Sequence, residues 1–314
     1  MRRVLVRRRD ALKGILSSAI AFGVDAREAA VGERLSPIPV TGKVRSNPIP
    51  QQVPVSAGVL QRGAGAGLYF WDTGGSGPVV VLAHPGSGSA LIWPYQQPAL
   101  AQAGYRVIAY SRRGHYLSPA GNATDSGTYA DDLNALIEHI GIDRFHLVGV
   151  AAGGFTAVDY AISFPSRVRS LTIACSQLGM WDPEVSADLK RVLTAGFLDF
   201  PLDFQELGAS YRALSPDGVQ LWLQLAAMSR EGTSRVRQTA KTAATWEKLR
   251  AVPARKLLIT GGADLIQPPA LMHLAAQRMG DCESAVIPEA GHAVHWEAPQ
   301  SFNSLLIDFL RRSG

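Results

Sequence analysis

Short apolar runs alternate with amphipathic stretches along most of the chain. A run such as 79–83 (VVVLA) is apolar at every position, which is typical of a strand buried on both faces. Strands are predicted at residues 58–62, 68–73, 79–83, 105–110, 145–150, 170–175, 256–260 and 284–287. Helices are predicted at residues 92–103, 129–140, 153–162, 268–278 and 299–312. Helices between buried strands predict an α/β fold, with a mainly parallel eight-stranded sheet covered by helices on both faces.

One long segment interrupts this alternation. Residues 177–250 separate two predicted core strands and are helical in pattern, with many apolar and aromatic residues. An insertion at this place in the chain predicts a helical cap over a pocket. Residues 58–314 are therefore expected to form one domain that carries a cap insertion at about 177–250.

Proline marks the segment that precedes this domain. Residues 31–57 contain Pro37, Pro39, Pro48, Pro50 and Pro54. So many prolines exclude a helix or a central strand. We expect a linker, either an extended tether or an arm along the domain surface.

Most of the net charge of +5 lies at the N-terminus. Residues 1–26 hold six basic and two acidic residues: Arg2, Arg3, Arg7, Arg8, Arg9, Lys13, Asp10 and Asp25. The rest of the chain is close to neutral, so the basic pI near 9.4 does not indicate a nucleic-acid partner.

The same N-terminal residues have the layout of an export signal. An apolar stretch, GILSSAIAFGV, follows the arginines and is shorter than the roughly 20 residues that span a bilayer. The run that begins Arg8-Arg9-Asp10 resembles a twin-arginine signal, although Ala11 and Asp25 depart from the usual pattern. We expect residues 1–30 to be a leader and the protein to be periplasmic or secreted. The alternative is a basic N-terminus on a cytoplasmic protein.

Composition excludes several other classes. A hydrophobic fraction of 46% excludes a disordered chain, and two cysteines cannot form a disulfide framework or a Cys-rich zinc site. No phosphate loop or dinucleotide fingerprint occurs, and the histidines are scattered. The sequence therefore predicts no cofactor, no metal and no stable membrane insertion.

Four segments that follow predicted strands carry the chemical signals. They are the loop His84-Pro85-Gly86-Ser87-Gly88-Ser89, the run Tyr110-Ser111-Arg112-Arg113-Gly114-His115, the junction Gly149-Val150-Ala151-Ala152-Gly153-Gly154, and the pair Gly261-Gly262-Ala263-Asp264 with Ala290-Gly291-His292. Their order and spacing resemble the α/β-hydrolase superfamily over residues 58–312. The resemblance implies a His base at His292, an orienting acid at Asp264, and an oxyanion hole made by the backbone N–H groups of Gly86 and Ala152.

The nucleophile position departs from that family. The elbow G-x-S-x-G is written here as Gly149-Val150-Ala151-Ala152-Gly153, with Ala151 where a nucleophile is expected. A methyl group cannot attack a carbonyl, and no shift of register supplies a hydroxyl. Other nucleophiles near strand ends are weak candidates: Cys175, Ser176, Ser87 and Ser111.

Three interpretations follow from this departure. The first is an enzyme that uses the His292–Asp264 dyad and the oxyanion hole without a covalent step, for hydrolysis or for C–C or C–O bond chemistry. The second is a catalytically inactive relative that binds a small ligand. The third is a variant of an ordinary serine hydrolase in which alanine replaces the serine. The first is favoured, because the base, the acid and the oxyanion loop are all in register.

The expected substrate is small and apolar. The cap is rich in aromatic residues, and Trp93 and Trp181 are the predicted substrate contacts. An apolar carbonyl or ester-like molecule fits such a pocket, and conventional serine esterase activity is doubtful without the hydroxyl.

Overall fold

A single mixed sheet runs through the computed structural model, which describes residues 34–35, 48–122, 124, 126–180, 182, 187, 193, 195–232, 234 and 236–314. The strands are β1 (Arg34–Leu35), β2 (Val55–Gln61), β3 (Gly67–Asp72), β4 (Val79–Ala83), β5 (Arg106–Tyr110), β6 (Phe145–Val150), β7 (Val168–Ala174), β8 (Arg255–Gly261) and β9 (Glu283–Ile287). Eight of them, β2–β9, are the strands that the sequence predicts. The two-residue β1 pairs with β2 at the edge of the sheet and was not foreseen.

The strand order is β1-β2-β3-β5-β4-β6-β7-β8-β9. The pairs from β1 to β5 are antiparallel, and those from β5 to β9 are parallel. Parallel strands need crossover connections, and the helices between them provide these. The prediction of a mainly parallel sheet is confirmed.

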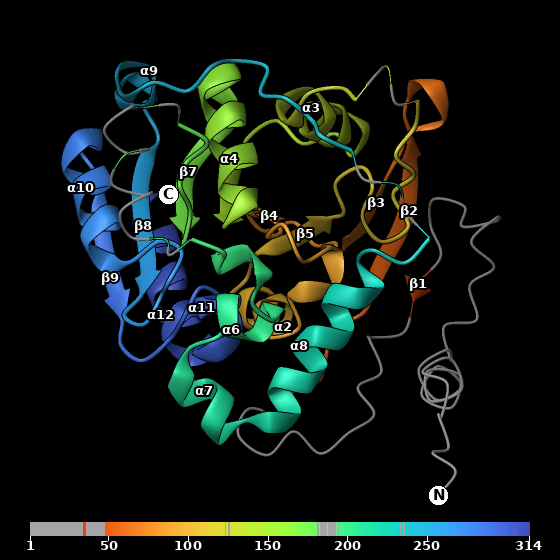
Figure 1. Cartoon of the computed structure of the whole chain (residues 1–314). Coiled ribbons are helices and arrows are strands. Elements are labelled where there is room, and N and C mark those ends of the chain that lie inside the picture. The colour runs from red at the N-terminus through yellow and green to blue at the C-terminus, as the bar shows by residue number, and fades with distance from the viewer. Residues whose placement is uncertain are drawn as a thin grey trace, which may run out of the picture.

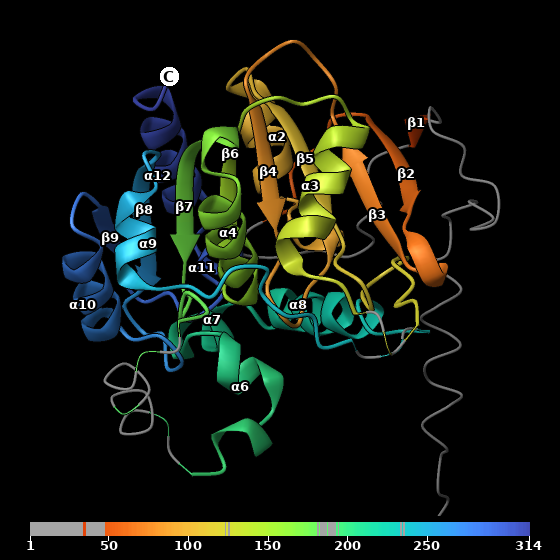
Figure 2. The ribbon, with the colours of Figure 1, turned by 90° about the horizontal axis from the view of Figure 1, so that it is seen from above.

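Helices cover both faces of the sheet. The described α-helices are α2 (Gln96–Gln102), α3 (Tyr129–His139), α4 (Ala152–Ser163), α6 (Leu202–Glu206), α7 (Ala209–Leu214), α8 (Pro216–Met228), α9 (Trp246–Ala251), α10 (Pro269–Met279), α11 (Val294–Glu297) and α12 (Pro299–Arg311). Successive residues of β4 show why both faces must be covered. Val80 and Leu82 join the apolar cluster that includes α2 and α12, whereas Val81 and Ala83 join the cluster that includes α3, α4 and α10 (Figure 2). None of the described helices is long and apolar enough to cross a membrane.

The insertion between β7 and β8 contributes α6, α7 and α8, which lie at the carboxyl ends of the parallel strands (Figures 1 and 2). The chain then returns along the outer surface of α3 and α4. There the Asp159 carboxylate of α4 accepts hydrogen bonds from the backbone N–H groups of Lys241, Thr242 and Ala130, at 2.9, 2.9 and 3.1 Å. The second half of the predicted cap segment is thus bound to the core and does not lie over the strand ends.

The proline-rich arm packs against the domain where it is described. Gln52 donates its side-chain amide to the Pro94 carbonyl at 2.7 Å, and Val53 exchanges two hydrogen bonds with the side chain of Gln97. β2 begins at Val55, three residues before the expected domain boundary. Residues 48–57 therefore fit the surface-arm alternative and not the free tether. The predicted leader, residues 1–30, lies outside the described residues.

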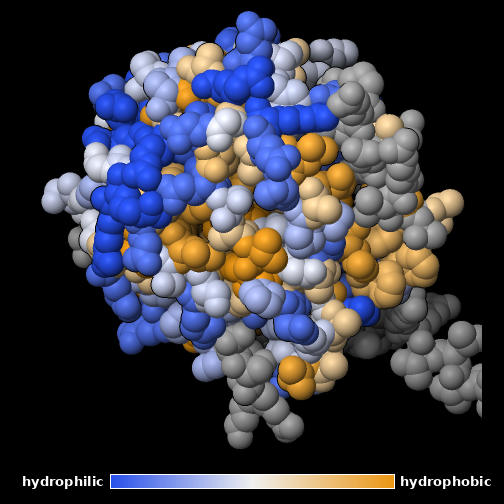
Figure 3. All heavy atoms as spheres, turned by 90° about the vertical axis from the view of Figure 1, so that its left-hand side faces the viewer, coloured by the Kyte–Doolittle hydropathy of each residue, from blue (hydrophilic) through white to orange (hydrophobic). Residues whose placement is uncertain are grey.

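Charged side chains protect the exposed sheet edge at β9. Arg255 and Arg312 both pair with the Glu283 carboxylate, at 2.7 and 2.8 Å. Figure 3 shows the side of the molecule that carries β9 and α10, where apolar atoms gather within a hydrophilic surround. Val286 of β9 is half exposed, and charges next to such a residue on an edge strand disfavour pairing with another chain.

Candidate active site

His292 and Asp264 meet across the ends of two neighbouring strands. Asp264 lies on the loop after β8 and His292 on the loop after β9, and the imidazole Nδ1 lies 2.9 and 3.0 Å from the two carboxylate oxygens. A carboxylate only accepts hydrogen bonds, so Nδ1 carries the proton and Nε2 is left for chemistry. Asp264 is itself held by the backbone N–H groups of Ile266 and Gln267, both at 2.8 Å from Oδ1.

The pair stabilises its own charged form. Burial alone would lower the pKa of His292, but the Asp264 carboxylate, together with Glu206 and Glu297, raises that pKa above its ordinary value. Burial would raise the pKa of Asp264, and the facing His292 with the two backbone donors brings it below its ordinary value. The acid therefore stays ionised while the base gains and loses a proton, as general base catalysis requires.

Ala151 occupies the turn between β6 and α4 in a strained conformation. Its φ is 51° and its ψ is −117°, a region that L-residues rarely adopt. The glycines around it explain how the chain can turn so tightly. A Cβ on Gly149 would lie 2.4 Å from the Gly153 carbonyl oxygen, and one on Gly153 would lie 2.0 Å from the Ala83 carbonyl oxygen. The elbow geometry is therefore present without a nucleophile.

The two predicted oxyanion donors lie next to each other. Ala152 is the first residue of α4, so its N–H has no carbonyl four residues earlier in the helix to bind. A Cβ placed on Gly86 would lie 3.6 Å from the Ala152 Cβ, which brings the loop after β4 against the start of α4. The structure thus brings together two loops that are 66 positions apart in the sequence, as the sequence analysis expected.

The model of the alpha/beta hydrolase fold matches residues 78–299. The chain belongs to this family. An acetyltransferase component of the acetoin cleaving system of Pseudomonas putida is 30% identical over 84% of this chain and 70% of its own length. A 2-hydroxy-6-oxononadienedioate/2-hydroxy-6-oxononatrienedioate hydrolase of Paraburkholderia phymatum is 27% identical over 80% of this chain and 93% of its own.

Solved structures agree on the fold of this α/β-hydrolase. A thermophilic esterase from Thermogutta terrifontis has a TM-score of 0.68 at 24% identity, covering 82% of this chain and 98% of its own. A bromoperoxidase from Bacillus anthracis has a TM-score of 0.64 at 24% identity, covering 82% and 100%. The predictions of the α/β-hydrolase fold and of an enzyme of the hydrolase class are confirmed at that level.

His84 and Arg112 brace the loop after β4, which carries Gly86. The Arg112 backbone N–H donates to His84 Nε2 at 3.0 Å, so Nδ1 carries the imidazole proton and donates it to the Pro85 carbonyl at 2.7 Å. The Arg112 guanidinium donates to the carbonyls of His84 and Pro85, at 3.2 and 3.1 Å. Arg113 pairs with a carboxylate, Asp132, at 2.7 Å.

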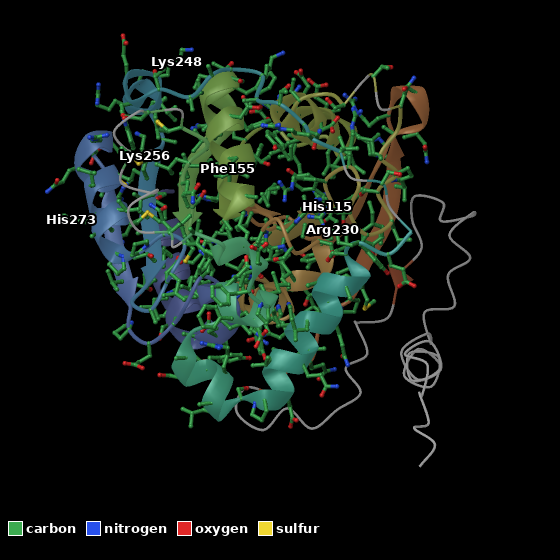
Figure 4. The ribbon with its side chains drawn as sticks, viewed as in Figure 1. His115, Phe155, Arg230, Lys248, Lys256 and His273 are labelled. Carbon is green, nitrogen blue, oxygen red and sulfur yellow. The ribbon has the colours of Figure 1, made fainter. Side chains whose placement is uncertain are left out.

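A second arginine reaches the same loop from the cap side. Arg230, just after α8, donates Nη2 to the Gly86 carbonyl at 2.5 Å. Figure 4 shows it close to His115, whose Nδ1 lies 2.9 Å from the Gly88 carbonyl. Burial, Arg112 and Arg230 lower the pKa of His115 to about 3, which keeps this imidazole neutral. His273 lies far from both, on the outer surface of α10 (Figure 4).

The alternative nucleophiles are all in unfavourable positions. Burial and the neighbouring Asp264 raise the pKa of Cys175 well above its ordinary value, so its thiolate is disfavoured. Ser176 donates its hydroxyl to the Ala151 carbonyl at 2.6 Å, and Ser87 donates its own to Glu206 at 2.9 Å. Ser111 is fully buried and accepts the Ala90 N–H at 3.1 Å.

Cys175, Asp264 and His292 form a group that could hold a metal ion, because their ligand atoms lie within 4.8 Å of one another. A metal would need the Cys175 thiolate and would replace the proton that His292 Nδ1 shares with Asp264. The donors present are better matched to a hydrogen-bonded dyad, because Asp264 already accepts two backbone N–H groups and one imidazole N–H.

The sequence analysis did not assign roles to two buried carboxylates beside the dyad. Glu297 accepts the backbone N–H groups of Gly208 and Gly291 at 2.8 and 3.0 Å and that of Ala293 at 3.3 Å. Glu206 of α6 accepts the Ser87 hydroxyl and the Trp222 indole N–H. No motif could have identified Glu206, since it comes from the inserted cap.

The two predicted substrate contacts have different outcomes. Trp93 is 1% exposed and packs on the ring of His295, with centroids 4.9 Å apart. A direct contact between Trp93 and substrate stays a prediction and would require these buried rings to move apart. Trp181 lies outside the described residues. His295 is fully buried.

Proposed function

We propose that this protein is a hydrolase that activates water, or removes a substrate proton, directly with His292 and forms no covalent intermediate at residue 151. One observation carries the proposal: the His292–Asp264 hydrogen bond is in place at 2.9 Å, while the strained elbow presents only the methyl group of Ala151. Strain of about 1–3 kcal/mol is retained in native proteins where surrounding structure enforces it, and it clusters at functional sites.

The chemistry follows from what each group can do. His292 Nε2 accepts a proton from water as the water oxygen attacks a carbonyl carbon, and Asp264 stabilises the imidazolium that forms. The N–H groups of Ala152 and Gly86 stabilise the negative charge that develops on the carbonyl oxygen. One such donor is worth roughly 10²–10³ in kcat, so the hole supports catalysis without a serine. The same groups suit an enolate formed during C–C bond cleavage.

The proposed substrate is a small apolar carbonyl compound or ester. The aromatic content of the cap supports this proposal, as do relatives named as a carbamate hydrolase and as a 2-hydroxy-6-oxononadienedioate/2-hydroxy-6-oxononatrienedioate hydrolase. We further propose export through the twin-arginine-like N-terminus, on the sequence of residues 1–26 alone. N-terminal sequencing of the natively expressed protein tests this, and an intact Met1 would contradict a cleaved leader.

The proposal is tested by assaying wild type, His292→Ala and His273→Ala on esters, lactones and β-diketones. His273 is exposed on α10 and serves as the matched control. We expect wild type and His273→Ala to turn over the same substrate and His292→Ala to lose that activity by about 10³-fold or more. Equal activity in wild type and His292→Ala would refute the dyad. A protein that is inert on every substrate and co-purifies with a ligand would support a binding function instead.

A further inference from the structure

Glu206 is a buried carboxyl group that the cap places beside the catalytic loops. It is the last residue of α6 and only 9% exposed. An acidic side chain is seldom buried to this extent unless hydrogen bonds or charges compensate. Its surroundings therefore indicate what it does.

Three contacts tie Glu206 to both sides of the site. Its Oε2 accepts the Ser87 hydroxyl at 2.9 Å and the Trp222 indole N–H at 3.0 Å. Its backbone carbonyl accepts the N–H of Ala293 at 3.0 Å. Ser87 directly follows the oxyanion residue Gly86, and Ala293 directly follows His292. Glu206 thus binds the residue that directly follows Gly86 and the residue that directly follows His292.

The hydrogen bonds decide which oxygen can carry a proton. Among the described residues, both side-chain donors to this carboxyl end on Oε2. The Trp222 indole can only donate, so Oε2 is an acceptor there and the acid proton belongs on Oε1. The two titratable groups that face Glu206 are His292 and Asp264, from the loops after β9 and β8. Burial dominates over the attraction of His292 and raises the pKa of Glu206, which favours the protonated acid.

We propose that Glu206 is a second acid–base residue of this site and gives the proton of Oε1 to the leaving atom of the substrate. The inference rests on the proposed non-covalent hydrolysis. Water loses a proton to His292 Nε2, and its oxygen bonds to the carbonyl carbon. The bond from that carbon to the leaving oxygen breaks, and the leaving oxygen takes the proton from Glu206. The imidazolium then releases its proton to solvent and the Glu206 carboxylate takes one from solvent, so both groups return to their starting states.

A separate proton donor is useful in a site where the protonated form of the base is stabilised. Asp264 raises the pKa of His292, which makes the imidazolium a weaker acid toward the leaving group. The neutral carboxylic acid of Glu206, in the cap, supplies a proton to the leaving oxygen while His292 still carries the proton that it took from water. Pairs of groups whose surroundings separate their pKa values commonly divide the acid and base roles in this way.

The test compares Glu206→Gln with Asp203→Asn, a control on the same helix. Glutamine keeps an oxygen that accepts from Ser87 and Trp222 but has no acid proton, and Asp203 engages α6 through its backbone carbonyl. With alkyl esters, whose leaving group needs a proton, we expect Glu206→Gln to lower kcat by about 10²-fold or more. With nitrophenyl esters, whose leaving group needs none, we expect a loss of less than about tenfold.

The pH profile gives a second readout that a purely structural role would not change. In wild type, kcat on alkyl esters should fall as pH rises through the raised pKa of Glu206, and Glu206→Gln should lack this fall. Asp203→Asn should match wild type throughout. If Glu206→Gln keeps wild-type kcat and pH profile, or loses alkyl and nitrophenyl ester hydrolysis equally, Glu206 is not the proton donor.

The same data separate this inference from the proposed function. If His292→Ala is inactive and Glu206→Gln behaves like wild type, the non-covalent dyad survives and the role of Glu206 is refuted. If His292→Ala retains full activity, the proposed function itself fails. Thermal unfolding of each variant, followed by circular dichroism, shows whether a loss of activity comes from a loss of fold.

Discussion

Ser176 donates its hydroxyl to the carbonyl oxygen of Ala151 at 2.6 Å, and this hydrogen bond helps to hold the elbow in its strained turn. The Ala151 N–H is also fixed, to the Ala174 carbonyl at 2.9 Å. Hydrogen bonds therefore fix both the N–H and the carbonyl group of residue 151. The strain at Ala151 is a property of the surrounding structure and does not depend on the side chain that occupies the position.

Ala151→Ser should convert this turn into a nucleophile. The conformation is already enforced, so we expect the variant to react with a fluorophosphonate at one site per chain and to hydrolyse activated esters at least about 10²-fold faster than wild type. Mass spectrometry of the labelled protein measures the first effect. Ala151→Gly, which adopts the same turn without a hydroxyl, should stay unlabelled. An unreactive Ala151→Ser would mean that His292 Nε2 does not reach position 151.

Asp264→Asn should change both the rate and its pH dependence. The carboxylate raises the pKa of His292, and burial alone lowers it. Without the carboxylate, the imidazole should lose its proton at a lower pH, so the acidic limb of kcat/KM should move to lower pH. The rate on the plateau should fall by about 10³–10⁴-fold, because the correct tautomer is no longer enforced. The exposed Asp308 provides a control in Asp308→Asn, and an unmoved acidic limb would contradict the role of Asp264.

Gly153→Ala should destabilise the elbow and the oxyanion loop together. The new Cβ would lie 2.0 Å from the Ala83 carbonyl oxygen and 2.8 Å from that of His84, both of them backbone atoms. We expect a loss of at least about 2 kcal/mol in the free energy of unfolding, measured by urea denaturation. Gly63→Ala adds a methyl group with nothing within 4 Å and should change stability by less than about 0.5 kcal/mol. Equal stability of the two variants would show that α4 can move away from the end of β4 at little cost.

Glu297→Ala should loosen the loop that carries His292. It removes the acceptor of the N–H groups of Gly208, Gly291 and Ala293, and we expect a cost of about 2–5 kcal/mol in the free energy of unfolding. Glu283→Ala, on the exposed β9 edge, should cost about 1 kcal/mol or less. A Glu297→Ala variant as stable as Glu283→Ala would be incompatible with this role.

The cost of Glu297→Ala should also depend on pH. Burial raises the pKa of Glu297 to about 7, above its ordinary value of 4.5, so the folded state binds a proton that the unfolded state has released. The protonated carboxyl is the form that the fold favours. The advantage of wild type over the variant should therefore be largest below about pH 4.5 and should shrink as the pH rises through 7. Urea denaturation across this range measures the difference.

The resemblance to the α/β-hydrolase superfamily was sufficient to place His292 and Asp264 as a dyad, and the sheet explains why the two residues meet. Asp264 and His292 each follow a strand, and the strands proved to be neighbours, so their side chains had to meet at one edge. Glu206 could not be found in this way. Its position depends on how an inserted segment folds back over the strand ends, and no spacing in the sequence encodes that path. The acceptors of Arg112 were missed for a related reason, since they are main-chain carbonyls that no residue type indicates.

The inserted segment is bound to the rest of the domain at separate places along its length, and this has a mechanical consequence. Glu206 accepts the hydroxyl of Ser87, on the loop after β4, and farther along the chain the backbone N–H groups of Lys241 and Thr242 bind the Asp159 carboxylate of α4. Because Gly208 and Arg230 also bind Glu297 and the Gly86 carbonyl, the segment is held at several points and is not a lid on a single hinge. Opening the segment as one lid would break all of these hydrogen bonds, so passage of a substrate would require local movement of the segment and would leave the elbow at the start of α4 in place.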